Sequence, residues 1–272
     1  MRRPIPDNSW TGEMNYVANH DRVSWLEPRE LPHVYHRYRH WIARLDGLVS
    51  KLGAQTVLNV GCAQGTIDIM LAERGISVTA IEIRPGFLEY AKLRESPEAL
   101  TRVNWVLGNL FEVEPPGGPF DLVMSHHVIE HVTDPEKFVS RLAAFSRPGG
   151  HVLVTTPSWH YMRNRLPDLR KAGDLTKYPH FENSDDGDDH LFAFRQSELV
   201  RLGEETGIEV AEHFFYGSFL QQGHLKTRWL ARLLPSGLGS RLVNMLEPLA
   251  NVPGIGMMLF ANQAVLWRKP FQ

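Results

Sequence analysis

The feature that most constrains this chain is a regular alternation of short apolar runs with helical patterns between residues 56 and 156. Five of the runs have the length and composition of buried strands: Thr56–Val60, Ser77–Ile83, Val103–Leu107, Phe120–Ser125 and His151–Thr156. Helical patterns lie between several of them, at Thr66–Arg74, at Gly86–Arg94 and from Asp134 to Phe145. Strands that alternate with helices predict βαβ units and an α/β fold with a parallel sheet.

The regions outside this alternation have other patterns. Residues 1–30 are polar and contain prolines, and we expect an irregular arm there. Apolar residues recur at helical spacing from Val34 to Leu52, which predicts an amphipathic helix that ends at Gly53. Ile208–Tyr216 and Met257–Trp267 resemble strands. We therefore expect an N-terminal arm and helix (1–53), a core (54–216) with a long acceptor loop (157–195), a helical insertion (217–256) and a last strand of the core sheet (257–272).

Composition narrows the class of protein. The 272 residues include 29 Lys and Arg against 31 Asp and Glu, a net charge of -2, so the overall basic excess of many nucleic-acid binders is missing. The single cysteine, Cys62, excludes an internal disulfide and favours a reducing compartment. The sequence shows neither a secretory signal pattern nor an apolar stretch of the roughly 20 residues that a membrane-spanning helix needs. We expect a cytoplasmic globular protein.

A turn rich in small residues joins the first predicted strand to the next helix. Its sequence is Asn59-Val60-Gly61-Cys62-Ala63-Gln64-Gly65. Small residues let a ligand approach the backbone closely, and the start of the following helix presents free N–H groups. The spacing matches neither the dinucleotide fingerprint G-x-G-x-x-G nor a Walker loop. Glu82 follows 21 residues after Gly61, at the end of the second strand, where a carboxylate accepts hydrogen bonds from ribose hydroxyls. Together these features predict a nucleoside-binding site.

These motifs resemble those of the class I S-adenosylmethionine-dependent methyltransferases over roughly residues 54–216. The resemblance rests on the small-residue turn, on Glu82 and on three further motifs: Gly108-Asn109-Leu110-Phe111, Phe120-Asp121-Leu122-Val123 and Arg147-Pro148-Gly149-Gly150. It implies a Rossmann-like sheet with helices on both faces, here with an N-terminal helical arm and a C-terminal helical insertion. Asn59 and Ala63 depart from the family, in which an acidic residue and a glycine are common at these positions.

The resemblance also implies which residues bind S-adenosylmethionine. Glu82 would accept from the ribose, and Asn109 with the Leu110 N–H would bind the adenine. The backbone carbonyl of His126 would lie near the methionyl end of the cofactor. The expected cofactor-binding residues are Asn59, Gly61, Cys62, Ala63, Gly65, Glu82, Ile83, Asn109, Leu110, Ser125 and His126.

Histidines cluster directly after the fourth predicted strand, in Ser125-His126-His127-Val128-Ile129-Glu130-His131. Ligands of parallel sheets bind beyond the carboxyl ends of the strands, so these residues are expected at the reaction centre. A helical turn over 127–131 would place His127, Glu130 and His131 on one face. In a first interpretation, His127 or His131 removes the proton of a hydroxyl acceptor, and Glu130 sets its tautomer.

Two other interpretations remain open. In one, Glu130 and His131 only pack and hydrogen-bond behind the cofactor. In the other, the run resembles the E-x-x-E-H segment of metal-assisted O-methyltransferases, such as those of ubiquinone biosynthesis and of small-RNA 2′-O-methylation, and His127, Glu130, His131 and His190 would bind a divalent metal. Because His127 replaces a Glu, such a site would suit a softer ion than Mg²⁺. The candidate catalytic residues are His127, His131 and His190.

We expect an enzyme that transfers a methyl group from S-adenosylmethionine to a small-molecule acceptor and releases S-adenosylhomocysteine. Oxygen is the favoured acceptor atom, because a histidine-rich centre suits the deprotonation of a hydroxyl. RNA 2′-O-methylation is an alternative that the charge balance disfavours. An NAD-dependent oxidoreductase, which the loop spacing disfavours, and a non-catalytic binding module of the same fold are alternatives from other classes.

Two segments outside the cofactor motifs, 157–195 and 225–249, predict the surroundings of the acceptor. The loop 157–195 contains six aromatic residues that belong either to the core or to a pocket that excludes water: Trp159, Tyr161, Tyr178, Phe181, Phe192 and Phe194. The segment 225–249 mixes basic and apolar residues, a pattern typical of a lid, a dimer face or a contact with a membrane surface. A homodimer is compatible with this pattern, whereas a nucleic-acid partner is not expected.

Overall fold

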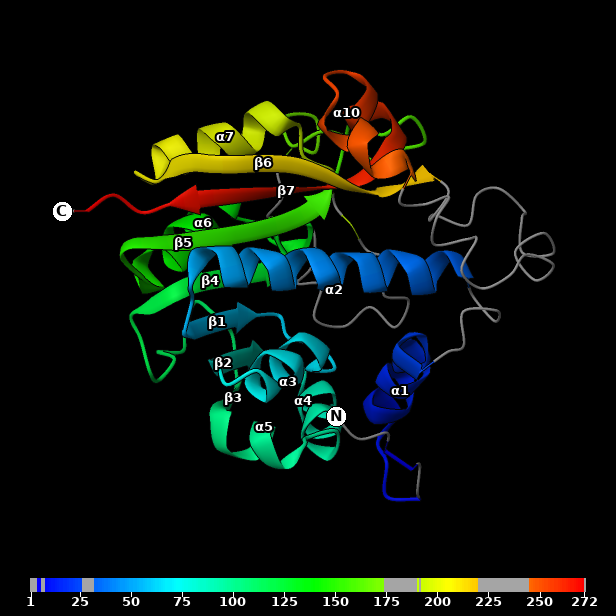
Figure 1. Ribbon diagram of the computed structural model, residues 1–272, viewed down its shortest axis with the longest axis vertical. Helices are drawn as coiled ribbons and strands as arrows, with labels where there is room; N and C mark the ends of the chain where they lie inside the picture. Colours follow the sequence, from blue (N-terminus) through cyan, green and yellow to red (C-terminus); the bar gives the residue numbers. More distant parts are fainter. Residues whose placement is uncertain are drawn as a thin grey trace.

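A computed structural model describes residues 4–5, 8–25, 32–173, 190, 192–219 and 245–271 of the chain. It contains one seven-stranded sheet with helices on both faces (Figure 1). The strand order is β3-β2-β1-β4-β5-β7-β6, and β7 is antiparallel to both of its neighbours, whereas the first five strands are parallel. The strands are β1 (Thr56–Val60), β2 (Ser77–Glu82), β3 (Val103–Leu107), β4 (Phe120–His126), β5 (Ser146–Pro157), β6 (Glu209–Ser218) and β7 (Phe260–Arg268). The predicted Rossmann-like class I methyltransferase sheet is confirmed.

The helices follow the predicted alternation. They are α1 (Gly12–Trp25), α2 (Pro32–Leu52), α3 (Thr66–Glu73), α4 (Pro85–Leu93), α5 (Pro97–Arg102), α6 (Pro135–Phe145), α7 (Gln196–Glu205) and α10 (Ile255–Leu259), with the 3-10 turns η1 (Ile129–His131) and η5 (Glu247–Asn251). The first turn of α6 shows how the local sequence specifies where a helix begins. The Asp134 carboxylate accepts from the Lys137 N–H at 3.0 Å, and Pro135 occupies the first turn, where no N–H is needed.

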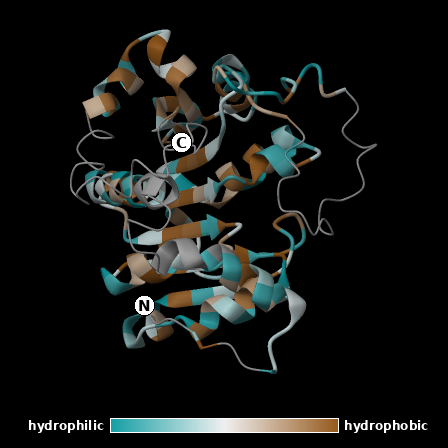
Figure 2. Ribbon diagram, turned by 90° about the vertical axis from the view of Figure 1, so that its right-hand side faces the viewer, coloured by the Kyte–Doolittle hydropathy of each residue, from teal (hydrophilic) through white to brown (hydrophobic). Residues whose placement is uncertain are grey.

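Two apolar clusters fill the space between the sheet and its two helix layers. On one face, Trp41 and Leu45 of α2 pack with Ile69 of α3. On the other face, Phe138 of α6 and Leu199 of α7 are fully buried. Figure 2 accordingly shows mostly hydrophobic strands between helices that mix hydrophobic and hydrophilic residues. The core is therefore a three-layer sandwich, and it holds the carboxyl ends of the parallel strands in fixed positions.

The expectation of an irregular N-terminal arm is wrong, because residues 12–25 form the helix α1. The sequence of α1 lacks a regular apolar stripe, so apolar periodicity does not indicate a helix there. Its buried apolar side chains Met14 and Val17 pack with Trp10 against Tyr90 of α4. The helix is therefore held by tertiary contacts with α4 rather than by its own periodicity.

Two strand boundaries also differ from the expected ones. The strand expected at His151–Thr156 begins earlier, at Ser146, because the Gly149 N–H donates to the Lys269 carbonyl and the Lys269 N–H donates to the Gly150 carbonyl, both at 2.9 Å. The last strand begins at Phe260, after the short helix α10. In both cases the boundary depends on a partner that is distant in sequence.

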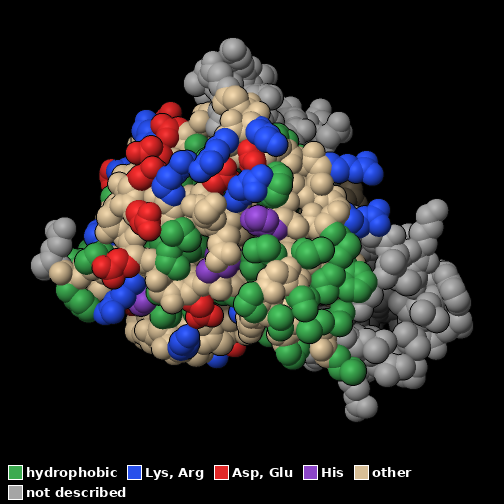
Figure 3. Space-filling view, turned by 90° about the horizontal axis from the view of Figure 1, so that it is seen from above, with side chains coloured by type: hydrophobic (Ala, Val, Ile, Leu, Met, Phe, Trp, Pro, Cys, Tyr) green, Lys and Arg blue, Asp and Glu red, His purple; other side chains and the backbone are tan. Residues whose placement is uncertain are grey.

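The predicted helical insertion is described from residue 245 onward. There, η5 and α10 cover β6 through a small cluster that includes Phe215, Ala250 and Phe260. Several apolar side chains of this segment are exposed, namely Met245, Val252, Ile255 and Met258. Figure 3 shows hydrophobic side chains gathered on one side of the face that it draws. Residues 220–244 lie outside the described part of the chain, so the lid, dimer-face and membrane-contact interpretations of 225–249 stay predictions. No helix among the described residues is long and apolar enough to cross a membrane.

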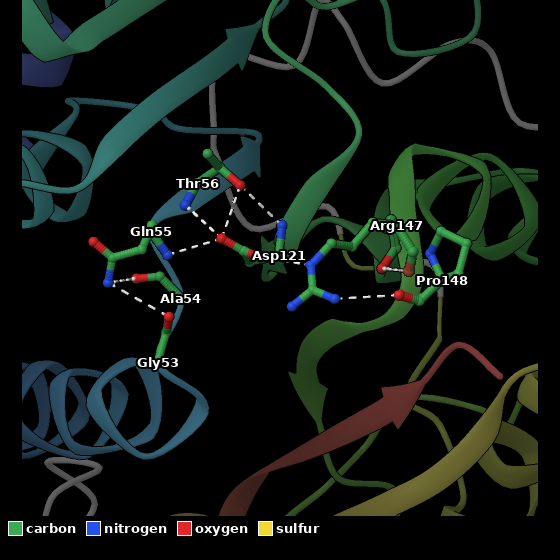
Figure 4. A network of polar contacts seen from close by, with 8 residues as sticks. Gly53, Ala54, Gln55, Thr56, Asp121, Arg147 and Pro148 are labelled. Atoms are coloured by element: carbon green, nitrogen blue, oxygen red, sulfur yellow. Dashed lines mark hydrogen bonds and ion pairs between the residues drawn. The ribbon is translucent and has the colours of Figure 1, made fainter. Parts of the chain in front are cut away.

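The amino ends of three adjacent strands are joined through one carboxylate, that of Asp121 at the start of β4 (Figure 4). Asp121 Oδ2 accepts from the N–H groups of Gln55 and Thr56, each at 2.9 Å, and from the Thr56 hydroxyl at 3.0 Å. Asp121 Oδ1 accepts from Arg147 Nε at 2.6 Å. Burial alone would raise the pKa of Asp121, but these hydrogen bonds outweigh it and lower the pKa.

We expect Asp121→Asn to lower the free energy of unfolding at pH 7 by about 1–3 kcal/mol, because a charge-assisted network loses its acceptor. Since the pKa is lowered on folding, this contribution is complete above the unfolded value of about 3.9 and is lost as the pH falls through the folded pKa. Urea denaturation of both proteins at pH 7 and at low pH measures the difference. Equal free energies at pH 7 would show that the network contributes nothing.

Candidate active site

The candidate site lies where β1, β2, β4 and β5 end, the edge at which parallel α/β sheets bind ligands (Figure 1). Register places the end of β1 beside the ends of both neighbours, because Val60 pairs with Ile81 and with Ser125. The small-residue loop, the loop after Glu82 and the histidine cluster therefore meet at this edge. The sheet brings together the three segments to which the sequence assigns binding and chemistry.

The small-residue loop after β1 is tightly constrained. Gly61, Ala63 and Gly65 all have positive φ angles, of 77°, 47° and 68°. A Cβ at Gly61 would collide with the Val128 side chain, which belongs to the histidine segment. The N–H groups of Gly61 and Cys62 both donate to the Ile81 carbonyl of β2, at 2.9 and 3.1 Å. The close packing of Val128 therefore requires glycine at position 61, and we call this tightly turned loop, residues 61–65, the cradle.

Glu82 connects this loop to the next one. Its side chain is buried, and Oε2 accepts from the Ala63 N–H at 2.8 Å. Oε1 accepts from the N–H groups of Ile83 and Arg84, each at 3.0 Å. Burial raises the pKa of Glu82, although these hydrogen bonds oppose the shift. Oε1 already accepts two hydrogen bonds, but Oε2 accepts one and can accept a second, so Glu82 can hold the two loops and still accept from a ligand hydroxyl.

The other residues expected at the cofactor have clear positions around this cradle. Ile83 is 40% exposed beside Glu82, an apolar side chain left uncovered at the site. Asn109 Oδ1 accepts from the Phe111 N–H at 3.0 Å, which fixes the turn after β3. Ser125 is buried and donates to the Val60 carbonyl at 3.1 Å. Burial raises the pKa of Cys62 well above its usual value, so the thiol stays protonated and is no nucleophile.

Asn59 makes a contact that the sequence did not indicate. Its Nδ2 donates to both carboxylate oxygens of Asp68 on α3, at 2.9 and 3.1 Å, and both side chains are buried. The acid that is common in the family at position 59 is thus replaced by an amide that binds an acid on the next helix. Burial raises the pKa of Asp68 to about 7. Asn59 Oδ1 is buried and has no hydrogen-bond partner among the residues that the structure describes.

The Asp68 carboxyl predicts a pH-dependent stability. Its folded pKa of about 7 lies above the value of about 3.9 expected in an unfolded chain. The folded state therefore retains a proton that the unfolded chain releases, and the free energy of unfolding falls as the pH rises through this window, at most by about 1.4 kcal/mol per pH unit. We expect Asp68→Asn to remove this dependence, so its stability relative to the natural protein should increase between pH 5 and pH 8.

Urea denaturation of both proteins at pH 5 and pH 8 tests this expectation. Asp121→Asn, which alters a carboxylate whose pKa is lowered, is the control: its stability difference from the natural protein should stay constant between pH 5 and pH 8, because Asp121 titrates below this range. A stability difference between Asp68→Asn and the natural protein that stays constant over this range would contradict it.

The histidine segment begins in an unusual backbone conformation. β4 ends at His126, and His127 has a φ of 55°, a left-handed conformation that is uncommon for a residue other than glycine. The helical turn expected over 127–131 is restricted to the three residues Ile129–His131. His127 and Glu130 are nevertheless in contact, as expected: His127 Nδ1 lies 2.8 Å from Glu130 Oε1.

Glu130 is the centre of the cluster. Its side chain is fully buried, and its Oε1 also lies 3.8 Å from Nε2 of His190, which comes from the segment after β5. Burial alone would raise the pKa of Glu130, but the nearby His127, His131 and His190 outweigh it and lower the pKa. The other oxygen, Oε2, is buried, and within the described part of the chain it has no hydrogen-bond partner. The lowered pKa favours the ionised form of Glu130, so a carboxylate anion lies among three imidazoles.

His126 and His127 are held by residues that the sequence analysis missed. His127 Nε2 lies 3.0 Å from the Tyr216 hydroxyl of β6, so both of its ring nitrogens are hydrogen-bonded. His126 Nδ1 lies 2.6 Å from the Thr155 hydroxyl, and its ring stacks on Trp41 with centroids 4.7 Å apart. No local pattern in the sequence indicates Tyr216 or Trp41 as partners, because an aromatic residue in a helix or strand is ordinarily assigned to the core.

A metal ion would find three ligand groups here. One ligand atom each from Glu130, His131 and His190 lies within 4.8 Å of the others. One carboxylate and two imidazoles form a donor set that suits a transition metal better than Mg²⁺, and the unpartnered Glu130 Oε2 fits such a role. His127, the fourth candidate, is outside this group and contacts Glu130 instead.

Two of the aromatic residues expected in the acceptor loop belong to the core. Phe192 and Phe194 are fully buried in the apolar cluster that contains Phe138 and Leu199, so the core interpretation holds for these two. The Trp159 ring lies 3.4 Å from the Arg195 guanidinium. Tyr178 and Phe181 lie outside the described residues.

Comparison with known proteins points to one family. A family model described as a methyltransferase domain matches residues 31–213. An uncharacterized methyltransferase of Mycobacterium tuberculosis is 35% identical over 127 residues, which are 47% of this chain and 62% of the relative, so the chain covers less than two thirds of that relative. A ubiquinone biosynthesis O-methyltransferase of Leptothrix cholodnii is 30% identical over 194 residues, 68% of this chain and 78% of the relative.

Solved structures show the same fold. A putative sarcosine dimethylglycine methyltransferase from Galdieria sulphuraria superimposes with a TM-score of 0.60 at 15% identity, covering 94% of this chain and 98% of that one. The methyltransferase domain of bacterial CtHen1 superimposes with a TM-score of 0.54 at 17% identity, covering 85% and 98%. At these identities the likeness concerns the fold alone.

Proposed function

Because this chain belongs to the class I S-adenosylmethionine-dependent methyltransferases, we propose that it methylates a hydroxyl oxygen of a small-molecule acceptor. The observation that carries the proposal is the buried Glu130, placed among three histidines at the carboxyl edge of the sheet. Ubiquinone biosynthesis O-methyltransferases and a malonyl-[acyl-carrier protein] O-methyltransferase among the relatives support an oxygen acceptor. Family membership sets aside the NAD-dependent oxidoreductase alternative.

The cofactor supplies an electrophilic methyl group when it is bound, and the residues of this edge fit it. The cradle, residues 61–65, turns tightly after β1, and its small residues let a ligand approach the backbone closely. Glu82 offers buried carboxylate oxygens to ribose hydroxyls, and the exposed side chain of Ile83 offers an apolar surface to a base. Asn109 and Leu110 form the turn on the adenine side. Alignment of the acceptor with the methyl group would supply most of the rate enhancement.

Proton removal is assigned to His131 or His190. His127 has both ring nitrogens hydrogen-bonded, so we give it a positioning role. His131 and His190 are partly exposed, and their ring centroids lie 4.9 Å apart. The acceptor O–H proton would pass to the imidazole as the bond from oxygen to the methyl carbon forms and the sulfur–methyl bond of the cofactor breaks, and Glu130 would stabilise the resulting imidazolium.

A second candidate is metal-assisted O-methylation at the same residues. It is favoured by the convergence of Glu130, His131 and His190, whose ligand atoms lie within 4.8 Å of one another. In that case the two histidines would hold a divalent ion that lowers the pKa of the acceptor hydroxyl, instead of taking its proton directly.

Cofactor binding is the first expected outcome. S-adenosylhomocysteine should bind the natural protein in isothermal calorimetry, and Glu82→Ala should weaken the binding by roughly tenfold or more, because hydrogen bonds to a charged acceptor are lost. Asp121→Asn, at the opposite edge of the sheet, is the control that should keep its affinity. No binding at millimolar ligand would refute the proposed cofactor.

Turnover should depend on the two histidines. We expect His131→Ala and His190→Ala each to lose turnover by roughly 100-fold or more while keeping their affinity for S-adenosylhomocysteine. S-adenosylhomocysteine release with a panel of phenolic and aliphatic hydroxyl acceptors measures it. His151→Ala, a substitution at a histidine that pairs with Leu122 near the start of β4, is the matched control.

Chelation separates the two candidates. Loss of turnover in EDTA that a divalent ion restores would favour the metal, whereas unchanged turnover would favour the histidine base. Full turnover of both histidine variants would exclude either role.

A further inference from the structure

The two loops of the cofactor site are attached to one helix that belongs to no recognised motif. α1 lies beside α4, at the edge where the parallel strands end (Figure 1). It carries one acidic side chain near its start, Glu13, and another near its end, Asp21. Each of them contacts a different part of the cofactor site.

The end of α1 is held by a buried ion pair. Asp21 and Arg94 are both fully buried, with Oδ1 and Nη2 3.2 Å apart. The Tyr90 hydroxyl of α4 donates to the other Asp21 oxygen, Oδ2, at 2.6 Å. A buried charge that loses its partner is strongly destabilised, so α1 must be docked for Arg94 to keep its position.

Arg94 in turn holds the small-residue loop. Its Nη1 donates to the Gln64 carbonyl at 2.6 Å and to the Thr66 hydroxyl at 2.7 Å. Gln64 precedes Gly65 within the loop, and Thr66 is the first residue of α3. The guanidinium therefore connects Asp21 of α1 directly to the backbone of the predicted cofactor cradle.

The start of α1 holds the other loop. Glu13 Oε2 accepts from the Gly86 N–H at 2.8 Å, and Oε1 accepts from Arg84 Nε at 3.1 Å. A Cβ at position 86 would collide with the Glu13 side chain, so this close approach requires glycine. Arg84 and Gly86 follow directly after Glu82, whose carboxylate joins the two loops.

We propose that the docking of α1 on these two loops is coupled to cofactor binding. Asp21 and Arg94 are positioning residues for the small-residue loop. The inference rests on the proposed binding of S-adenosylmethionine at this edge. Because coupling between two equilibria is reciprocal, a bound cofactor must tighten α1 by the same factor by which a docked α1 tightens the cofactor. A pair that only stabilises the fold would not produce this reciprocity.

Binding and hydrogen exchange test the coupling in the full chain. Asp21→Asn and Arg94→Met should each weaken S-adenosylhomocysteine binding by roughly tenfold, since each removes a charge-assisted contact that orders the loop. The double variant should be little weaker than either single variant, because the two residues act through one contact. In the natural protein, S-adenosylhomocysteine should slow amide exchange in residues 12–25, and this protection should be lost in the variants.

Controls separate the coupling from general loss of stability. Asp121→Asn should lower the melting temperature without changing the affinity. Glu13→Gln, at a side chain that is 34% exposed, is the milder variant that folds even where loss of the buried pair prevents folding, and it should reduce the protection of α1.

Unchanged affinity in Asp21→Asn and Arg94→Met would overturn the proposed coupling of α1 to the cofactor, and so would an exchange rate of α1 that S-adenosylhomocysteine does not alter. Either result would leave the proposed function intact. Failure of the natural protein to bind S-adenosylhomocysteine would overturn both.

Discussion

The carboxylate of Glu82 is the interaction on which the rest of this site depends. A buried carboxylate is costly unless hydrogen bonds compensate it, and Glu82 obtains them from the backbone of two loops, at Ala63 and at Ile83 and Arg84. The two loops are therefore held at a fixed distance from each other. α1, through Glu13 and through Asp21 with Arg94, attaches to these same two loops from outside.

Three buried carboxyl groups at the carboxyl edge have different partners and therefore different properties. Asp68 faces an amide, and burial raises its pKa to about 7. Glu82 faces backbone N–H groups, and its pKa is also raised. Glu130 faces imidazoles, which lower its pKa. The charge at Glu130 is thus the one best maintained at neutral pH, and it lies beside the histidines to which we propose to assign proton removal.

Much of the fold was predictable because its signals are local. The alternation of strands and helices, the small-residue turn and the acid after β2 each depend on a few neighbouring residues. The prediction failed where a partner distant in sequence decides the structure. α1 lacks an apolar stripe and is helical because it packs on Tyr90, and β5 begins early because Lys269 pairs with Gly149 and Gly150.

By itself, the sequence determined the sheet, the position of the cofactor edge and the presence of histidines there, because strand and helix periodicity and turn chemistry act over short distances. Only the tertiary structure decided which side chains meet. Tyr216 reaches His127 from a strand at the far side of the sheet, and Asp21 reaches Arg94 from the N-terminal helix. These contacts depend on how whole elements pack, and no local pattern in the chain records that packing.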